Sequence, residues 1–374
     1  MTDSNKLLNY MTTPDGLRIM FVGDLHLDGA IHGRHKNYAD VCLECLSQIL
    51  KSVMQNHINM IIFSGDISDG SLIRDSALQQ KYLEMFAILN VFTDYHVYSL
   101  AGNHDMHSGV NLYYLLKTTT LIKTVDTMKS GYVKDEFFVD GGEGYCSYLK
   151  IGDLRIHLMN YADNYLFLHT ESKVSESNPN DSVVDLLVSH ADWYIPNVTP
   201  FMPNSDDTVL LSEATNLEGV DFIINGHIHH PVFELEVDLL NQKAVYINAG
   251  CYTTPTFDPD MWDHVYFPVI SLTKTVENGA EVCSLAVSEN KIEIDALSRF
   301  VELADKLQKC EELEQDESED TADSIASVLS AIKSIVSQGA DMIHSLAETL
   351  TDNDEVRKIF LTTFEDVTKT HQAS

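Results

Sequence analysis

The stretch LRIMFVGDLHL (residues 17–27) decides the fold, because an apolar run there ends abruptly in a carboxylate and an imidazole. A short apolar run that stops at a glycine is typical of a buried β-strand that gives way to a loop. Related blocks follow at GDISD (65–69), GNHD (102–105), SH (189–190) and GHIH (226–229). Nearly all five blocks end an apolar run, so we expect their polar side chains to lie where buried strands end.

The segments around the first three blocks predict alternating strands and helices. We expect strands at residues 17–23, 58–63 and 96–100, and helices at 38–56 and 75–91. This order implies parallel pairing with right-handed crossovers, and therefore an α/β fold. In open α/β sheets, ligands bind beyond the carboxyl ends of the strands, where the blocks would converge. Further short strands are expected at 155–159, 183–188, 221–225 and 244–248.

The five blocks together offer carboxylates, imidazoles and one amide, which are ligands for divalent cations. A carboxylate at Asp66, directly after a glycine, can bridge two ions, and the amide of Asn103 adds an oxygen without adding charge. Each residue alone is more often an ordinary buried or capping residue, but five ordered blocks outweigh that reading. Two metal ions side by side are a device for hydrolysing phosphate esters. The candidate ligands are Asp24, His26, Asp66, Asn103, His190, His227 and His229.

Composition narrows the class of partner. The chain has 374 residues, is 44% hydrophobic and carries a formal net charge of −33, which disfavours broad contact with a phosphate backbone. No stretch approaches the roughly 20 apolar residues of a membrane span. The first residues lack the features of a signal peptide, so we expect a cytoplasmic protein without a membrane partner. Cys42 and Cys45 form a lone CxxC pair within an expected helix, which favours core packing over metal or redox work.

The chain changes character after Cys251. We expect a metal-site core at residues 1–250, a β-rich cap at 251–300, and an acidic linker with a helical tail at 301–374. Seven of the ten residues at 311–320 are acidic, which indicates a solvated linker. An apolar stripe over 321–350 fits a helical hairpin or a partner-binding helix, and a self-packed C-terminal helix is the alternative.

The ordered blocks resemble the calcineurin-like metallophosphoesterase superfamily over residues 17 to about 250. The resemblance implies a four-layer β-sandwich flanked by helices, with a small β-rich cap and a helical C-terminal segment. It also implies a division of the ligands between two ions, with a bridging hydroxide that attacks phosphorus. One ion would be held by Asp24, His26, Asp66 and His229, and the other by Asp66, Asn103, His190 and His227.

The resemblance gives His104 a role apart from the ligands. His104 would contact the leaving oxygen as a general acid or a charge stabiliser. Asp69 or Asp105 would orient His104 and favour its protonated form, and spacing does not choose between them. His32, His35 and His107 lie just beyond the ligand blocks and are candidate substrate contacts, with solvated loop histidines as the alternative.

Within the superfamily, the chain most resembles the SbcD-type DNA repair nucleases, including their phage relatives. The similarity rests on DLHL (24–27), GDISD (65–69), GHIHHP (226–231) and GCY (250–252). It implies exonuclease cleavage of DNA in repair and recombination, with endonuclease cleavage as a further activity. It also implies a cap that contacts DNA and C-terminal helices that bind an SbcC-type ATPase. Manganese is the expected metal, with iron, zinc or magnesium as alternatives, and a homodimer is also considered.

Two other functions stay open. A phosphatase or small-substrate phosphodiesterase would use the same centre, and the few Lys and Arg residues at 251–300 favour it: Lys274, Lys291 and Arg299. If the protein were a non-catalytic scaffold of this fold, we would expect some of the ligand residues to be replaced. All seven ligand positions and His104 are intact.

Overall fold

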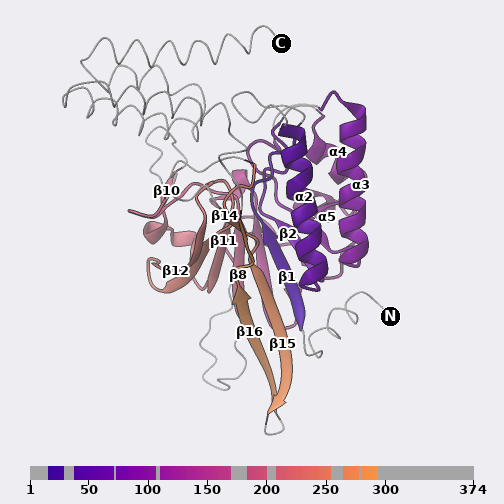
Figure 1. Cartoon of the computed structure of the whole chain (residues 1–374). Helices are drawn as coiled ribbons and strands as arrows, with labels where there is room; N and C mark the ends of the chain where they lie inside the picture. Colours follow the sequence, from indigo (N-terminus) through magenta and orange to yellow (C-terminus); the bar gives the residue numbers. More distant parts are fainter. Residues whose placement is uncertain are drawn as a thin grey trace, which may run out of the picture.

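Two stacked β-sheets form the centre of the molecule, and helices cover the outer face of the first sheet (Figure 1). The computed structural model describes residues 16–28, 38–70, 73–106, 110–169, 183–199, 208–253, 264–277 and 280–293. His32, His35, His107 and the predicted segment 301–374 lie outside the described residues.

The first sheet has the strand order β16-β15-β1-β2-β3-β4. Strands β1 (Leu17–Val22), β2 (Met60–Phe63), β3 (Val97–Ser99) and β4 (Lys123–Thr124) run parallel to one another. Helices α2 (Tyr38–Gln55) and α3 (Ser76–Phe92) connect the first three strands, as the alternating pattern predicts. Two shorter helices follow, α4 (Leu112–Thr118) and α5 (Val125–Lys129).

Local sequence explains the helices and their packing. The carboxylate of Asp75 caps α3 by accepting the backbone N–H groups of Ala77 and Leu78. Along α2, Cys45 and Ile49 are buried against the outer face of the first sheet, in one apolar cluster with Phe63. The prediction that the CxxC pair packs in the core is confirmed, since Cys42 and Cys45 are fully buried.

The second sheet has the strand order β12-β13-β11-β8-β7-β6-β5. Its strands are β5 (Phe138–Val139), β6 (Ser147–Ile151), β7 (Leu154–Met159), β8 (Val184–Ser189), β11 (Phe222–Asn225), β12 (Val232–Asp238) and β13 (Lys243–Asn248). Alternate side chains of the two sheets meet in a common core that includes Phe21, Ile62, Ile156, Val188 and Ile224. This core fixes the two sheets against each other.

The outer face of the second sheet is covered by short elements. Trp193, Leu211 and Leu217 pack there from strand β9 (Trp193–Tyr194) and from the 3-10 turns η2 (Leu211–Glu213) and η3 (Thr215–Leu217). Strand β9 pairs with β10 (Val209–Leu210). The sandwich and its layers agree with the expected fold, and the layer outside the second sheet is made of turns and short strands among the described residues.

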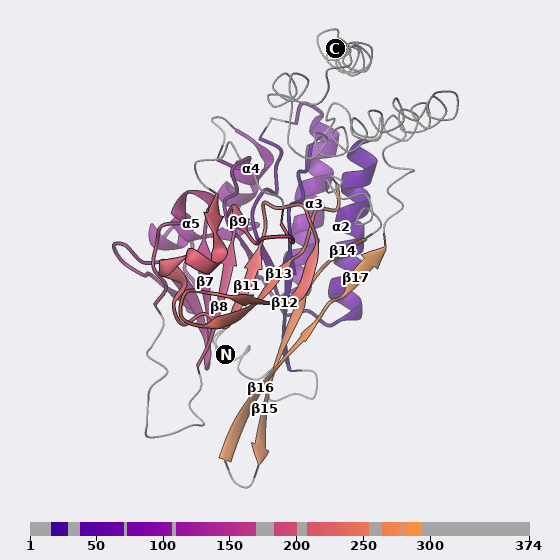
Figure 2. The ribbon, with the colours of Figure 1, turned by 90° about the vertical axis from the view of Figure 1, so that its left-hand side faces the viewer.

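The strands after residue 250 extend the first sheet. β15 (Val269–Glu277) pairs antiparallel with β1 and with β16 (Ala280–Ser288), and the hairpin of β15 and β16 projects beyond the sheets (Figures 1 and 2). Strands β14 (His264–Tyr266) and β17 (Lys291–Glu293) form a separate pair. The β-rich character of this segment matches the expectation, while the boundary at residue 250 stays a prediction. None of the described helices is long and apolar enough to cross a membrane.

Candidate metal centre

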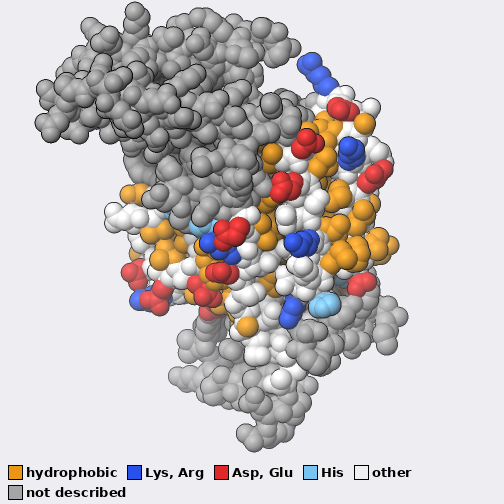
Figure 3. Space-filling view, in the orientation of Figure 1, with side chains coloured by type: hydrophobic (Ala, Val, Ile, Leu, Met, Phe, Trp, Pro, Cys, Tyr) orange, Lys and Arg blue, Asp and Glu red, His pale blue; other side chains and the backbone are white. Residues whose placement is uncertain are grey.

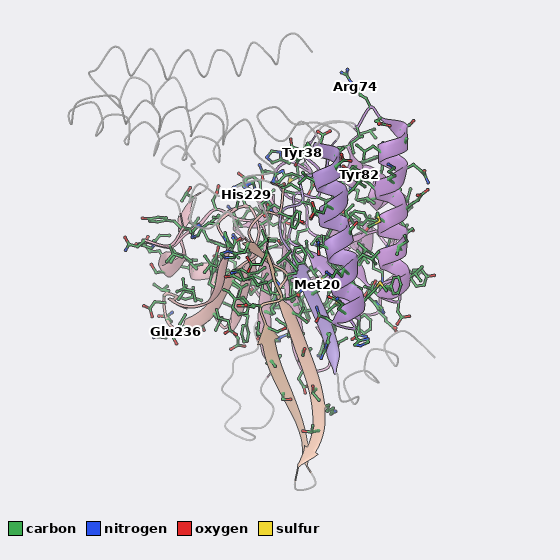
Figure 4. All side chains as sticks on the ribbon, viewed as in Figure 1. Met20, Tyr38, Arg74, Tyr82, His229 and Glu236 are labelled. Carbon is green, nitrogen blue, oxygen red and sulfur yellow. The ribbon has the colours of Figure 1, made fainter. Side chains whose placement is uncertain are left out.

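The five polar blocks meet at one end of the two sheets. Asp24, Asp66 and Asn103 follow β1, β2 and β3 of the first sheet, and His190 and His227 follow β8 and β11 of the second. Figure 4 shows His229 at this end, opposite the projecting hairpin of β15 and β16. The parallel strands therefore bring together residues that are some 200 positions apart in the sequence.

Backbone hydrogen bonds tie the loops of the first two blocks together. The N–H groups of Leu25 and His26 both donate to the carbonyl oxygen of Asp66, at 3.0 and 2.9 Å. The N–H of His227 donates to both carboxylate oxygens of Asp24, at 2.9 and 3.1 Å, and so joins the fifth block to the first. These bonds hold the blocks in register with one another.

Several of the site residues adopt backbone conformations that ordinary side chains disfavour. His26, Asp66 and His227 have φ angles of 45°, 48° and 69°, in the left-handed region. Such strain is retained where the surrounding structure enforces it, and it clusters at functional sites. The neighbouring loops also pass very close: a Cβ atom at Gly102 would lie 2.0 Å from Asp66 Oδ1, which only glycine avoids.

The first group of ligand atoms surrounds His26. Its Nε2 lies 3.0 Å from Nε2 of His229 and 3.8 Å from Oδ2 of Asp66. Oδ1 of Asp24 lies 4.0 Å from Nε2 of His229. Imidazole nitrogens and carboxylate oxygens this close together form a pocket of donors suited to a cation.

The second group lies on the other side of Asp66. Nε2 of His190 is 3.3 Å from Asp66 Oδ2 and 3.1 Å from the amide oxygen of Asn103, and Nδ1 of His227 is 3.0 Å from the same amide oxygen. Asp66 therefore contacts both groups, which is the position required of a bridging carboxylate. The structure thus brings together all seven of the predicted ligands.

Hydrogen bonds at the outer nitrogens orient three of the imidazole rings. Nδ1 of His190 donates to the carbonyl of Ser64 at 2.7 Å, Nε2 of His227 donates to Asp192 at 2.7 Å, and Nδ1 of His26 donates to Asp69 at 2.9 Å. A ring that donates outward presents its other nitrogen as a lone pair to the interior of the site. The tautomers inferred from these bonds are therefore those that metal ligation requires.

Among the described residues, histidines are the groups that can carry positive charge next to the buried carboxylates of Asp24 and Asp66. Burial raises the pKa of Asp24. Burial also acts to raise the pKa of Asp66, but the attraction and hydrogen bond of His190, with help from other histidines, lower it below its usual range. Burial disfavours a charged His190, yet Asp66 and Asp24 raise the pKa of this ring to about 9. A proton on His190 thus stands where a divalent cation would supply charge, and metal binding must displace it.

His104 lies beside the first group, and a ring nitrogen of His104 lies within 4.8 Å of ligand atoms of His26 and Asp66. Its Nδ1 is 3.4 Å from Oδ1 of Asp69, its side chain is 35% exposed, and its backbone N–H donates to Asp66 at 2.9 Å. Burial lowers the pKa of His104, and His26 adds to this effect, while Asp66 and Asp69 only partly offset it. Asp69 therefore acts in favour of the protonated ring, but burial and His26 outweigh it, and the net pKa of His104 lies below its ordinary value.

Asp69 and Asp105 have different surroundings. Asp69 contacts His104, whereas the carboxylate of Asp105 accepts backbone N–H groups from Ser68 and Gly102 at 3.0 and 3.1 Å. Burial, with the charge of Asp66, raises the pKa of Asp105 to about 7. Of the two residues proposed to orient His104, Asp69 is the one in position, and Asp105 fastens the loops of the second and third blocks.

Two residues near the site escaped the sequence analysis. Asp192 orients His227, and its position two residues after His190 in an extended segment is a signal that could have found it. The ring of Tyr161, in the 3-10 turn η1 (Tyr161–Asp163) after β7, has its centroid 5.2 Å from that of His227. Nothing in the local sequence distinguishes Tyr161 from other aromatic residues, because only the packing of β7 beside β8 brings it to the site.

The fold and the site together define a class: an α/β sandwich that gathers oxygen and nitrogen donors for two divalent ions at its strand ends. Carboxylates, imidazoles and a neutral amide suit manganese, iron or zinc, so the residues fit such a centre. The chain belongs to the calcineurin-like phosphoesterase family, whose profile matches residues 17–231. This family uses a dinuclear metal site, and the clusters of candidate ligands in this chain fit such a site.

Comparison with solved structures finds distant neighbours. A dimetal phosphatase from Danio rerio is 12% identical, with a TM-score of 0.41, over 75% of this chain and 99% of that one. A putative 5'-nucleotidase from Staphylococcus aureus is 14% identical, with a TM-score of 0.38, over 75% of this chain and 54% of that one. A 5'-nucleotidase precursor from Thermus thermophilus is 12% identical, with a TM-score of 0.35, over 74% and 54%. The chain thus spans about half the length of the two nucleotidases. Comparison with curated protein sequences finds no match.

Proposed function

We propose that the protein is a nuclease that hydrolyses phosphodiester bonds of DNA, in the manner of SbcD-type repair nucleases. The observation that carries the phosphoester chemistry is the position of Asp66 between two groups of ligand atoms. The motifs at 24–27, 65–69, 226–231 and 250–252 support the nuclease class. We further propose manganese as the metal, and the cytosol of a bacterium or of a phage-infected host as the location.

The proposed mechanism assigns the ligand residues to two metal ions and two further carboxylates to orienting their rings. Asp24, His26, Asp66 and His229 would hold one ion, and Asp66, Asn103, His190 and His227 the other. Two divalent ions supply Lewis-acid activation of water and neutralise charge on the phosphoryl oxygens. Asp69 and Asp192 keep the rings of His26 and His227 oriented toward the interior.

His104 is proposed to meet the leaving oxygen of the substrate. Its half-buried ring stands beside the first group, with ring centroids 4.7 Å from His26, and is held by Asp69. A general acid at this place would donate its proton to the oxygen that departs from phosphorus. Burial lowers the pKa of His104 when no substrate is bound. The negative charge of a bound phosphate ester would raise this pKa again and so favour the protonated ring.

A second candidate is a phosphatase or small-substrate phosphodiesterase with the same centre. The net charge of −33 favours it, since a DNA-binding groove needs cations that neutralise phosphates. On the face shown in Figure 3, basic and acidic side chains of the described residues are interspersed rather than gathered into a basic surface. Substrate preference therefore has to be measured directly.

The discriminating experiment is a manganese-dependent assay with four substrates. Labelled duplex DNA, single-stranded DNA, a chromogenic phosphodiester and a chromogenic phosphomonoester are compared with the full chain. The proposal expects cleavage of DNA and of the diester. Hydrolysis of the monoester or of the chromogenic diester without cleavage of either DNA would establish the second candidate, and no hydrolysis of any substrate would contradict both.

The role of His104 has its own test. The His104→Gln variant is expected to lose about 10²- to 10⁴-fold in turnover, the usual contribution of general acid–base catalysis, while its metal content is unchanged. His57→Gln, in the loop after α2, is the matched control and should behave as wild type. Loss of metal from His104→Gln would show instead that His104 is a ligand.

We also propose that residues 321–370 bind an SbcC-type ATPase partner. The apolar stripe in this part of the sequence supports the proposal. Deleting the segment should abolish complex formation with such an ATPase and leave hydrolysis of the chromogenic diester intact. Complex formation that survives the deletion would contradict it.

A further inference from the structure

A sulfur atom lies beside the first group of ligand atoms. Ligand atoms of His26, His229 and Cys251 all lie within 4.8 Å of one another, and Cys251 is 3% exposed. Metal–sulfur bonds are about 2.3 Å long and metal–nitrogen bonds about 2.0–2.1 Å, so two such donors on one ion lie up to about 4.4 Å apart. A small adjustment of the side chains therefore suffices for all three atoms to reach one ion.

The backbone holds Cys251 at this place. Strand β13 ends at Asn248, whose side-chain oxygen accepts the N–H of Gly250 at 2.9 Å, and Gly250 adopts a φ of +77°. A Cβ atom at Gly23 would lie 2.4 Å from the carbonyl oxygen of Gly250, so the end of β13 packs directly against the end of β1. This close approach brings Cys251 to the loop that carries Asp24 and His26.

Thr253, two residues after Cys251, is hydrogen-bonded to the same loop. The hydroxyl of Thr253 donates to the carbonyl oxygen of Leu25 at 2.8 Å and lies 3.6 Å from the sulfur of Cys251. Both Cys251 and Thr253 are buried. The segment 250–253 is therefore attached to the first block by backbone packing and by a hydrogen bond, independently of any bound ion.

The surroundings of Cys251 differ from those of the other buried cysteines that the structure describes. Cys42 and Cys45 belong to the apolar cluster under α2 and α3, and Cys146 belongs to the cluster outside the second sheet. Cys251 belongs to none of the three apolar clusters, and its sulfur faces two imidazoles instead. The first three cysteines pack in apolar clusters, whereas the sulfur of Cys251 lies beside the first group of ligand atoms.

We propose that Cys251 is a sulfur ligand of the first ion, together with Asp24, His26, Asp66 and His229. This inference rests on the proposed two-metal centre and makes its two positions unequal. The first position would offer a thiolate, which prefers zinc or iron, while the second offers only oxygen and nitrogen donors and is the position expected to take the proposed manganese. On coordination the thiol proton is released to solvent as the metal–sulfur bond forms.

Cobalt substitution tests the proposal spectroscopically. The full chain, stripped of metal and loaded with Co²⁺, is expected to show a sulfur-to-cobalt charge-transfer band in the near ultraviolet. The band should be absent from Cys251→Ser and unchanged in Cys146→Ser, a control at an equally buried cysteine outside the site. Cys251→Ala provides a second variant, and circular dichroism establishes that each variant is folded.

Metal preference gives a second measurement. Competition dialysis measures the ratio of the zinc affinity to the manganese affinity. This ratio is expected to fall about 10- to 100-fold in Cys251→Ser, which is the usual effect of removing groups that support a metal site. Cobalt bound by the wild type without a charge-transfer band would overturn the role of Cys251 alone. Failure of the wild type to bind cobalt at all would overturn both this role and the two-metal centre. A band that persists in Cys251→Ser would also reject the proposal.

Discussion

Two buried clusters of this protein pair carboxylates with histidines, yet they are built differently. At the amino end of β8, Asp185 receives two hydrogen bonds of 2.8 Å from Arg155 and one of 2.9 Å from His157. At the carboxyl ends of the strands, Asp24 and Asp66 face histidines and backbone N–H groups. In the described part of the chain, no Lys or Arg pairs with these two carboxylates.

The difference lies in what balances the buried charge. Arg155 and Asp185 form a bidentate pair that is 5% and 0% exposed, so the protein itself supplies both charges. The metal centre instead holds two carboxylates close together and leaves the balance to protons on histidine or to bound cations. A buried charge that the protein neutralises contributes to structure, whereas one that it leaves unbalanced marks a functional site.

The largest expected effect on activity comes from Asp66→Asn, which removes one negative charge from the metal centre but keeps the shape of the side chain. Metal content should fall, and ester hydrolysis should drop about 10³-fold, because metal ions supply several kcal/mol of charge stabilisation and each 1.4 kcal/mol is tenfold in rate. The unfolding free energy of the metal-free protein should change less than in the Arg155 variant described next. Elemental analysis, rate assays and denaturant titration measure these quantities. Retained metal and activity would remove the contrast between the two clusters.

The reciprocal variant is Arg155→Met, which leaves Asp185 buried without its cation. We expect a loss of about 3–5 kcal/mol in unfolding free energy, the usual cost of an uncompensated buried charge. Metal content should be unchanged in the folded fraction, because Arg155 is at the opposite end of β7 from the site. Urea denaturation followed by circular dichroism measures the loss. A stable variant that fails to bind metal would contradict the separation of roles.

The protonation of His190 predicts a pH dependence for the metal centre alone. Since its pKa in the metal-free protein is about 9, the ring carries a proton at pH 7 that a metal ion must displace. Metal affinity should therefore rise about tenfold per pH unit from pH 7 toward pH 9 and fall as the pH decreases. Calorimetric titration in buffers of different ionisation enthalpy counts the released protons. Affinity that is flat over this range would refute the protonated state of His190.

The same pKa sets the sign of a stability effect. Because the pKa of His190 is raised in the folded protein, its contribution to the stability of the metal-free form is fully present below about 6.5 and is lost as the pH rises through about 9. Thermal unfolding of the metal-free protein at several pH values tests this loss of stability.

The smallest effect is expected at an exposed ion pair, which calibrates the other measurements. Nζ of Lys117 lies 2.7 Å from Asp126, whose side chain is 63% exposed. The Lys117→Met variant should lose less than about 1 kcal/mol of unfolding free energy, as exposed pairs do. A loss as large as that of Arg155→Met would show that burial does not explain the contrast.

Much of the fold could be predicted from sequence because its elements are locally encoded. The expected helix at 38–56 is α2 (Tyr38–Gln55), and the expected strand at 221–225 is β11 (Phe222–Asn225). The parallel pairing of β1 with β2 is also confirmed. What could not be predicted is non-local: β15 joins the first sheet beside β1, about 250 residues earlier in the sequence, and no local pattern specifies that partner.

The sequence by itself determined the donor set and the chemistry, because the ligand types and their places after apolar runs are properties of short segments. Only the tertiary structure decided how those donors are arranged. It placed Asp69 rather than Asp105 beside His104, it gave His227 its partner Asp192, and it brought Cys251 beside His26 and His229. Each of these contacts joins loops of different strands. The first two depend on the pairing of β2 with β3 and of β8 with β11, and the third on the stacking of the two sheets and the glycine-permitted close approach of Gly23 and Gly250. The order of residues does not display these arrangements.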